Sequence, residues 1–433
     1  MTRLPSVTNP IDLSVDRVYY IIKSQNAMTK LRPHQERVVN SLRDNSRGQV
    51  IVPTGGGKTL CMIKDAQSQF NSCDWDVILK DPDRKTIVIV APRILLAQQL
   101  SEDFLEFLDV HPMLQYKVLH VHSGETHHFS STNPDTICDW ANLNYRYNKL
   151  IFTTYHSLHK IQDSKIAIDT LYFDEAHNSV QKNFQPPAKY YSTKTNSRCF
   201  FFTATPKHCL SDDKIGMETE EVYGKVLCDI PAPELVQQGH ILPPKVVIKK
   251  IQREDDSRHK CEHDCDNLLS TIDEQSMDKI LICARSTAQI VSLTSQTRFC
   301  SELEMRGYSW MYITSKTGAI VDGKKINREE FFTTLNKWGK DSTKKFVVLH
   351  HSILSEGINV AGLEAALFLR NMDYITISQT IGRVIRKGNV NKQFGLVVIP
   401  AWDRVGISTS KRVEAVVDTI FNKGQAAVSV VRS

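Results

Sequence analysis

The chain has 433 residues, of which 41% are hydrophobic, and its 54 Lys and Arg against 48 Asp and Glu give a net charge of +6. This length exceeds one ordinary hydrophobic core, so we expect two or three domains. The charge is compatible with a polyanionic partner but does not require one.

The cysteines and the apolar runs exclude two classes of protein. The ten cysteines are scattered, mostly within apolar segments, which favours reduced thiols over a disulfide framework. The longest apolar stretches are too short to cross a membrane. We therefore expect a cytoplasmic protein without a membrane partner, located in the host cytoplasm if the chain is viral.

Residues 1–30 are interpreted as an accessory segment, and a helix is expected from Leu31 to Arg43. It opens with the sequence L-R-P-H-Q. The amide of Gln35 has the donor and the acceptor needed to bind an adenine edge. Arg32 and Gln35 are therefore candidate nucleotide contacts, although a surface position for Gln35 is the alternative.

The stretch from Val50 to Thr59 reads V-I-V-P-T-G-G-G-K-T and predicts a buried strand followed by a phosphate-binding loop. Its glycines allow the loop to curl with amide hydrogens pointing inward, and the following helix directs its positive end at the same charge. The lysine would reach the β- and γ-phosphates, and the last threonine would place a hydroxyl on Mg²⁺. The strict pattern has glycine where Val52 stands, and a glycine-rich turn without nucleotide is the alternative. The predicted loop residues are Pro53, Thr54, Gly55, Gly56, Gly57, Lys58 and Thr59.

Further strands are expected at residues 86–90, 117–121 and 150–153. The first ends at Arg93, a cation at the edge where α/β sheets bind ligands, so Arg93 is a candidate phosphate contact. The histidine-rich segment from His120 to Asp135 is interpreted as a polar loop. A metal site there is disfavoured because no carboxylate or cysteine lies at ligand spacing.

Two adjacent carboxylates follow the predicted strand at residues 168–173, in the sequence D-E-A-H. Carboxylates at the end of an apolar strand are costly unless a cation or a proton transfer requires them. In an enzyme with a phosphate loop, Asp174 would hold Mg²⁺ through water and Glu175 would polarise the attacking water. A strand at residues 200–202 then leads to Thr203 and Thr205, whose hydroxyls are candidates for sensing the nucleotide state.

The composition of residues 229–244, rich in Pro and Gly, is typical of a hinge between two lobes. Residues 253–265 are interpreted as a solvated, charged loop, and no structural zinc is expected because the ligands are cramped and no second cysteine pair exists. Strands are predicted at 245–251, 279–284, 309–313 and 346–349, and a helix at 327–338. After the last strand, Ser355 is a candidate contact for a nucleic acid strand, and Glu356 and Gly357 are candidate nucleotide contacts.

Two arginines, Arg383 and Arg386, are spaced one helical turn apart near the end of the chain. Such a pair is ordinarily a solvated or DNA-facing stripe. We favour a catalytic role, in which both reach from the second lobe to the γ-phosphate as arginine fingers.

The order L-R-P-H-Q, P-T-G-G-G-K-T, A-P-R, D-E-A-H, T-A-T and Q-T-I-G-R-V-I-R resembles the motifs of superfamily 2 helicases and translocases of the DEAH-box type, over residues 31–390. The resemblance implies an α/β fold of two tandem RecA-like domains, 31–228 and 245–433, with ATP and Mg²⁺ in the cleft between them. It also implies contacts to the nucleic acid backbone from Arg93, Thr153, Thr314 and Ser355. The residues expected to couple the two lobes are His177, Thr203, Thr205 and Gln379.

The expected function is that of an ATP-dependent DNA helicase or translocase. The L-R-P-H-Q start, the D-E-A-H box and the compact size without a nuclease or long extension make the chain look similar to phage and viral recombination helicases that unwind or branch-migrate forked DNA. An RNA helicase is the alternative on substrate. A nucleotide-switched motor or docking subunit of a larger DNA-processing complex is the alternative on class.

Overall fold

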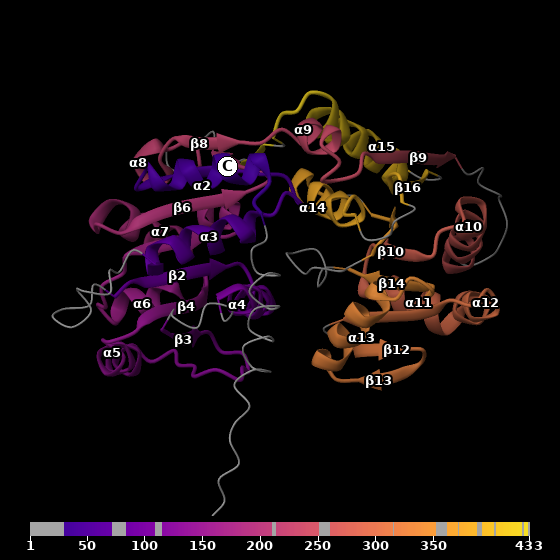
Figure 1. Ribbon diagram of the computed structural model, residues 1–433. Coiled ribbons are helices and arrows are strands. Elements are labelled where there is room, and N and C mark those ends of the chain that lie inside the picture. The colour runs from indigo at the N-terminus through magenta and orange to yellow at the C-terminus, as the bar shows by residue number, and fades with distance from the viewer. Residues whose placement is uncertain are drawn as a thin grey trace, which may run out of the picture.

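The computed structural model describes residues 30–71, 84–108, 115–209, 214–250, 260–314, 316–351, 362–370, 372–387, 392–401, 404–426 and 428–431. Three predicted contacts, Ser355, Glu356 and Gly357, lie outside the described residues, as does the accessory segment up to residue 29. The described residues form two α/β lobes that lie side by side, with α9 and α14 at their junction (Figure 1).

Lobe 1 is built on a seven-stranded, entirely parallel sheet with the strand order β3-β4-β2-β5-β6-β1-β8. Its strands are β1 (Arg47–Ile51), β2 (Thr86–Ala91), β3 (Tyr116–Val121), β4 (Asn148–Thr154), β5 (Thr170–Phe173), β6 (Arg198–Thr203) and β8 (Val226–Asp229). Its helices are α2 (Pro33–Arg43), α3 (Lys58–Asn71), α4 (Ile94–Leu108), α5 (Pro134–Leu143), α6 (Leu158–Asp163), η1 (Ala176–Val180), α7 (Gln185–Lys194) and α8 (Glu220–Tyr223).

Lobe 2 is built on an eight-stranded sheet with the order β13-β12-β11-β14-β10-β15-β16-β9, in which only the pairings made by β12 are antiparallel. Its strands are β9 (Pro244–Lys250), β10 (Lys279–Cys283), β11 (Ser309–Thr314), β12 (Gly318–Val321), β13 (Lys324–Ile326), β14 (Phe346–His350), β15 (Ala365–Phe368) and β16 (Gly395–Ala401). Its helices are α10 (Lys260–Gln275), α11 (Thr287–Gln296), α12 (Phe299–Met305), α13 (Arg328–Lys340), α14 (Tyr374–Val384) and α15 (Arg404–Val417).

The central strands read as apolar runs because helices cover both faces of each sheet. In β2 all six residues are buried, and alternate side chains enter different clusters. Ile87 and Ile89 pack into one cluster, whereas Val88 and Val90 pack into another. Burial of both faces of each sheet confirms the predicted α/β class of two RecA-like domains.

One segment adds an element to the predictions and another differs from them. The hinge contains a short helix, α9 (Ala232–Gln237), whose first turn accommodates Pro233. The predicted charged loop 253–265 is helical from Lys260 onward, where α10 buries Cys261 and Cys265 on one face. Glu262, Asp273 and Glu274 are exposed, whereas Asp264 is buried among the apolar positions and pairs with Arg285, and this interruption hid the helical period.

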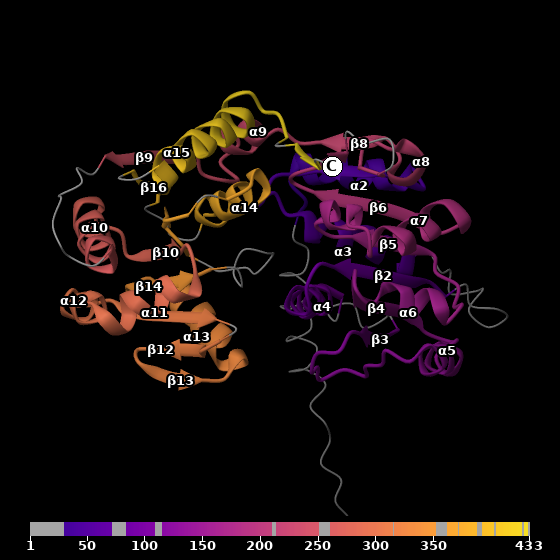
Figure 2. The same cartoon turned by 180° about the vertical axis from the view of Figure 1, so that it is seen from behind.

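The end of the chain returns to lobe 1, although it was predicted to belong to the second domain, 245–433. A strand at the C-terminus, β17 (Ser429–Val431), pairs in parallel with β7 (Lys207–Cys209), which directly follows β6. Figures 1 and 2 both place this end beside α2 and β8.

Over the described residues, no helix is both long and apolar enough to cross a membrane. Within the same residues every cysteine is free, and no group of three or more His, Cys, Asp or Glu side chains is arranged to hold a metal ion.

Candidate nucleotide site and interlobe cleft

The predicted phosphate loop lies between β1 and α3, at the carboxyl edge of the lobe 1 sheet. Gly55 and Gly57 have φ of 87° and 83°, a region that residues with a side chain rarely adopt. A Cβ at Gly57 would lie 2.3 Å from Nε2 of Gln35. Glycine is therefore required at this point both by conformation and by close packing.

Gln35 and its neighbour His34 brace this loop from α2. Both side chains are buried, and His34 Nε2 donates to the Gly56 carbonyl oxygen at 2.8 Å. Gln35 Oε1 accepts from the Arg32 amide at 3.0 Å, while its Nε2 lies 3.5 Å from the same Gly56 oxygen. The Gln35 amide thus contacts the loop itself, and the surface position considered for it is wrong.

Asp174 and Glu175 follow β5, next to the loop. The Asp174 carbonyl accepts from the Tyr155 hydroxyl at 2.9 Å, and Glu175 adopts a left-handed conformation with φ 48° and ψ 53°. This conformation is unusual for glutamate and places its carboxylate 3.8 Å from Lys58 Nζ and 3.7 Å from His177 Nδ1. Among the described residues, Glu175 Oε2 is buried and has no hydrogen-bond partner.

Burial and charge separate the pKa values of these two carboxylates. Burial raises the pKa of Asp174, and the negative charge of Glu175 raises it further. Burial acts in the same direction on Glu175, but its pKa is lowered on balance by Lys58, His177 and Arg383, together with a hydrogen bond to Gln379. Glu175 is thus held as the carboxylate, in the state that a general base requires.

A chain of hydrogen bonds connects this acidic pair to the end of β6. His177 Nδ1 lies 3.0 Å from Thr203 Oγ1, which also accepts from the Thr205 amide at 3.1 Å. Asn178 Nδ2 lies 3.3 Å from His177 Nε2 and donates to the Glu175 carbonyl at 3.0 Å. The structure therefore brings together three of the predicted coupling residues, His177, Thr203 and Thr205, in lobe 1.

Lobe 2 completes the site through α14. Gln379 and Arg383 are buried, and both act on the Glu175 carboxylate. Gly382 lies so close to the phosphate loop that a Cβ there would be 2.4 Å from Cβ of Thr54. The helix that carries the predicted arginine therefore rests directly on the loop.

Arg386 differs from its prediction in one respect. The pair was expected on one helical face, but α14 ends at Val384 and Arg386 lies beyond it, bridged to Ile241 of the hinge. The positive charge of Arg386 still interacts with Glu175, as does that of Arg383, so both arginines lie within electrostatic range of the carboxylate beside Lys58. Burial lowers the pKa of Arg383 to about 10, which leaves it a cation at neutral pH.

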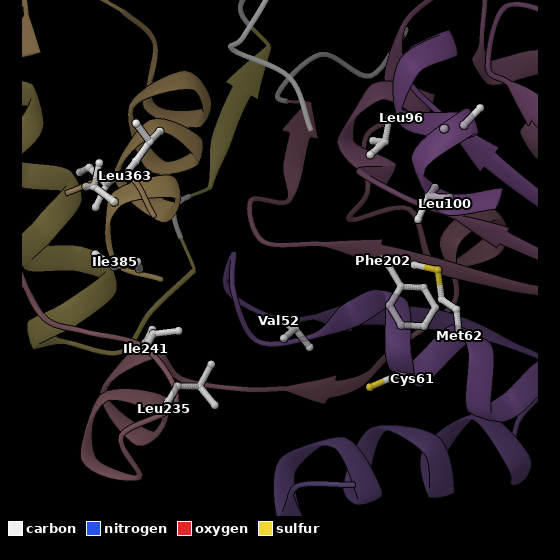
Figure 3. Close-up of a cluster of buried hydrophobic side chains, with 14 of the residues drawn as sticks. Val52, Cys61, Met62, Leu96, Leu100, Phe202, Leu235, Ile241, Leu363 and Ile385 are labelled. Atoms are coloured by element: carbon white, nitrogen blue, oxygen red, sulfur yellow. The ribbon is translucent and has the colours of Figure 1, made fainter. Parts of the chain in front are cut away.

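An apolar cluster continues across the junction beneath these polar groups. Figure 3 shows Leu235 and Ile241 of the hinge together with Val52 before the loop and Ile385 after α14. The two lobes therefore share one packed interface, which fixes the arginines relative to the loop.

The predicted nucleic-acid contacts have different surroundings. Arg93 follows β2 in lobe 1, and Arg328 begins α13 in lobe 2. Burial lowers the pKa of Arg328, and the nearby charge of Arg93 lowers it further, so the two arginines of different lobes are close in space. Thr153 is fully buried, and its hydroxyl donates to the Val121 carbonyl at 2.9 Å. Thr314 is buried, with its hydroxyl 2.7 Å from that of Thr317. Arg93 is exposed, whereas the Thr153 hydroxyl is turned inward and is not available to a nucleic acid in this conformation.

The histidine-rich segment is not a simple polar loop at its start. His120 and His122 are buried, 3.0 Å apart between Nδ1 and Nε2, and Ser101 Oγ lies 3.1 Å from His120 Nε2. Burial lowers the pKa of His120 to about 3, and the nearby His122 and His128 act in the same direction. His120 and His122 form a buried, hydrogen-bonded pair in which burial favours the neutral rings.

Sequence reasoning missed His34, Asn178 and the hinge residue Ile241. His34 stands next to Gln35 in L-R-P-H-Q, so its polar side chain in an amphipathic helix was a usable signal. Ile241 carries no such signal, because its partner Arg386 is distant in sequence. Asn178 directly follows D-E-A-H and contacts its near neighbours Glu175 and His177, so its position in the sequence was also a usable signal.

The residues around the loop fit a magnesium nucleotide. Asp174 is a buried carboxylate whose pKa is raised by its acidic neighbour, an arrangement that a divalent cation would relieve. Thr59 is the second residue of α3, at the positive end of that helix.

Comparisons with known proteins agree with this geometry. Residues 28–208 match the family described as Type III restriction enzyme, res subunit, and this region contains the phosphate loop, D-E-A-H and T-A-T. No curated protein sequence matches the chain significantly.

Several solved structures have a similar fold. The ATP-dependent Type ISP restriction-modification enzyme LlaBIII bound to DNA has a TM-score of 0.70 at 18% identity, covering 93% of this chain and 31% of that one. The helicase Lhr of Mycobacterium smegmatis, bound to ssDNA and AMP-PNP, has a TM-score of 0.63 at 15% identity, with coverages of 96% and 51%. Mss116p bound to ssRNA and AMP-PNP has a TM-score of 0.62 at 15% identity, with coverages of 99% and 82%.

The chain has the fold of tandem RecA-like helicase domains. It spans about a third of the length of the two Type ISP enzymes, LlaBIII and LlaGI, that it resembles.

Proposed function

We propose that the chain is an ATP-hydrolysing motor that moves on nucleic acid, with DNA as its track. One observation carries the proposal: the Glu175 carboxylate lies beside Lys58 of lobe 1 and interacts with Gln379 and Arg383 of lobe 2. A site divided in this way is complete only when the lobes are together. Nucleotide turnover would therefore be coupled to their closure and reopening.

Each predicted residue has a role in this proposal. Lys58 binds the β- and γ-phosphates, Glu175 accepts a proton from the attacking water, and Arg383 and Arg386 stabilise the charge of the transition state. Thr59, and Asp174 through water, would hold Mg²⁺, which neutralises phosphate charge when bound. The remaining nucleotide contacts are assigned to Arg32, Gln35, Glu356, Gly357 and the loop residues 53–57.

The choice of DNA is supported by the match to the res-subunit family and by the similarity to a Type ISP enzyme bound to DNA. The same findings favour one second candidate, a motor subunit within a larger restriction-type assembly, because those enzymes are about three times as long as this chain. Unwinding or branch migration of forked DNA is a narrower form of the first proposal and rests on the resemblance to phage and viral recombination helicases.

The deciding experiment measures ATP hydrolysis by the purified chain with linear duplex, forked DNA, four-way junctions, single-stranded DNA and RNA. DNA is expected to raise turnover above the rate without nucleic acid, and unwinding is measured on the same substrates. Stimulation by RNA alone would reject the DNA track. Turnover that no nucleic acid changes would favour the docking subunit.

A further inference from the structure

The last described residues, 418–426 and 428–431, connect the two lobes behind the nucleotide site, and we call them the C-terminal strap. The strap leaves lobe 2 at α15, which packs against α14, β16 and β9. Because α14 carries Gln379 and Arg383, the root of the strap moves with the catalytic side chains of lobe 2.

The middle of the strap lies on the hinge. A short π-helical segment, η2 (Asp418–Asn422), packs against α9, and Gly424 follows with φ 67°. A Cβ at Gly424 would lie 3.3 Å from Cβ of Pro231. The strap therefore follows the hinge closely and is not a free tail.

A small cavity lies where the two lobes and the strap meet. It has a volume of about 20 Å³, room for about one water molecule, and takes its walls from both lobes and the strap. Its lining includes Thr54, Ala204, Gly382, Phe421 and Gln425.

The end of the strap is fastened to lobe 1. In β17, Ser429, Val430 and Val431 pair with Lys207, His208 and Cys209 of β7. Strand β7 starts directly after Pro206. It therefore continues the segment in which the Thr203 hydroxyl contacts His177. The pairing of β17 with β7 therefore restrains lobe 1 near the end of β6, on the side that faces lobe 2.

We propose that the pairing of β17 with β7 is an intramolecular latch. While paired, it holds α14 against the phosphate loop in the closed arrangement seen here, and it releases when the lobes separate during turnover. A ladder of three residue pairs suits this task because few backbone hydrogen bonds must break for it to open. The link to turnover rests on the proposed function, but the latch itself does not.

A disulfide tests the latch directly. Val431 and the native Cys209 are in register, and neighbouring strands about 4.8 Å apart are within the range of Cα separations that a disulfide spans. In Val431→Cys, oxidation is expected to form this bond and to lower nucleic-acid-stimulated ATP turnover at least tenfold, with recovery on reduction. The matched control is Val430→Cys, whose partner His208 provides no thiol, so its turnover should not respond to the oxidant.

Two outcomes would overturn the proposal. Failure of the Val431→Cys disulfide to form would show that the strands are not paired in solution. Formation of the bond with unchanged turnover would show that release is not required.

A second measurement does not depend on activity. Val431→Pro removes a backbone N–H and fixes φ, whereas Val431→Ala keeps the backbone donor. Hydrogen exchange of α14 and of residues 53–59 is expected to be faster in the proline variant than in the alanine variant, and equal rates would reject the latch. If the natural chain hydrolyses no ATP under any condition, the proposed function fails while this comparison still tests the strap.

Discussion

At the cleft, the chemical properties of individual side chains depend on unusually close neighbours. Glu175 combines a left-handed backbone with contacts to Lys58 and His177, and these charges lower its pKa against the effect of burial. The same cations that keep it ionised lie where phosphate charge would enter. Glu175 is consequently suited to polarise water beside a bound phosphate, and changing it should separate binding from chemistry.

We expect Glu175→Gln to bind ATP and to hydrolyse it about 10²- to 10⁴-fold more slowly, because the amide cannot accept the proton. Binding is measured with a fluorescent ATP analogue and hydrolysis by phosphate release. Lys58→Ala provides the contrast, since it should weaken binding itself. Normal turnover in Glu175→Gln would remove the assignment of the base.

Arg383→Ala should leave ATP affinity nearly unchanged and lower kcat about 10³-fold, as expected for an arginine that stabilises the transition state. Arg383→Lys should remain slow because a lysine lacks the planar fork. Arg412→Ala, an exposed arginine of the same lobe whose side chain donates to the Met372 carbonyl, is the control. Equal losses in Arg383→Ala and Arg412→Ala would indicate a general effect on lobe 2.

At the scale of elements, the decisive contact is between α14 and the phosphate loop. Gly382 allows the helix to rest on Thr54, and the adjoining Leu242 amide donates to the Ile385 carbonyl at 2.7 Å. The helix is thus positioned by backbone contacts on both the loop and the hinge. Its side chains reach Glu175 only because this approach is so close.

Gly382→Ala should displace α14, since the new methyl group would overlap Thr54. Such a shift is expected to lower kcat about 10²-fold while nucleotide affinity changes little. Thr54→Gly removes the opposing Cβ and should restore part of the turnover in the double variant. Ser378→Ala on the same helix is the control, and wild-type kcat in Gly382→Ala would show that the close approach is not needed.

At the scale of the whole molecule, stability depends on buried neutral histidines. The pKa of His120 is lowered by burial to about 3, and burial also lowers the pKa of His34 and His350. An unfolded histidine titrates near pH 6.5, so the unfolded chain binds more protons than the folded one at acidic pH. The stabilisation is complete above about pH 6.5 and is lost as the pH falls toward the folded values.

We therefore expect the free energy of unfolding to decrease below pH 6.5, with His120 contributing about one proton, or about 1.4 kcal/mol per pH unit. Urea denaturation at a series of pH values measures the slope. His120→Asn should reduce it by about one proton relative to the natural chain. A slope in His120→Asn equal to that of the natural chain would contradict the assignment.

The sequence by itself determined the class of fold and the identity of most groups at the cleft. Apolar strands, a glycine-rich turn and paired carboxylates are local patterns, and each strand of a parallel sheet delivers the residues after it to the same edge. The sequence therefore placed Lys58, Asp174 and Glu175 at one edge of a sheet, whereas the strand order that brings them close is not the order along the chain.

Only the tertiary structure decided how the two halves of the site meet. Arg386 lies beyond its helix, Thr153 turns inward, and β17 returns to β7, because each position is set by contacts with segments far away in the sequence. Long-range packing leaves no periodic trace in the residues that make it. Local chemistry is therefore readable from the chain, whereas the approach of one lobe to the other requires the fold.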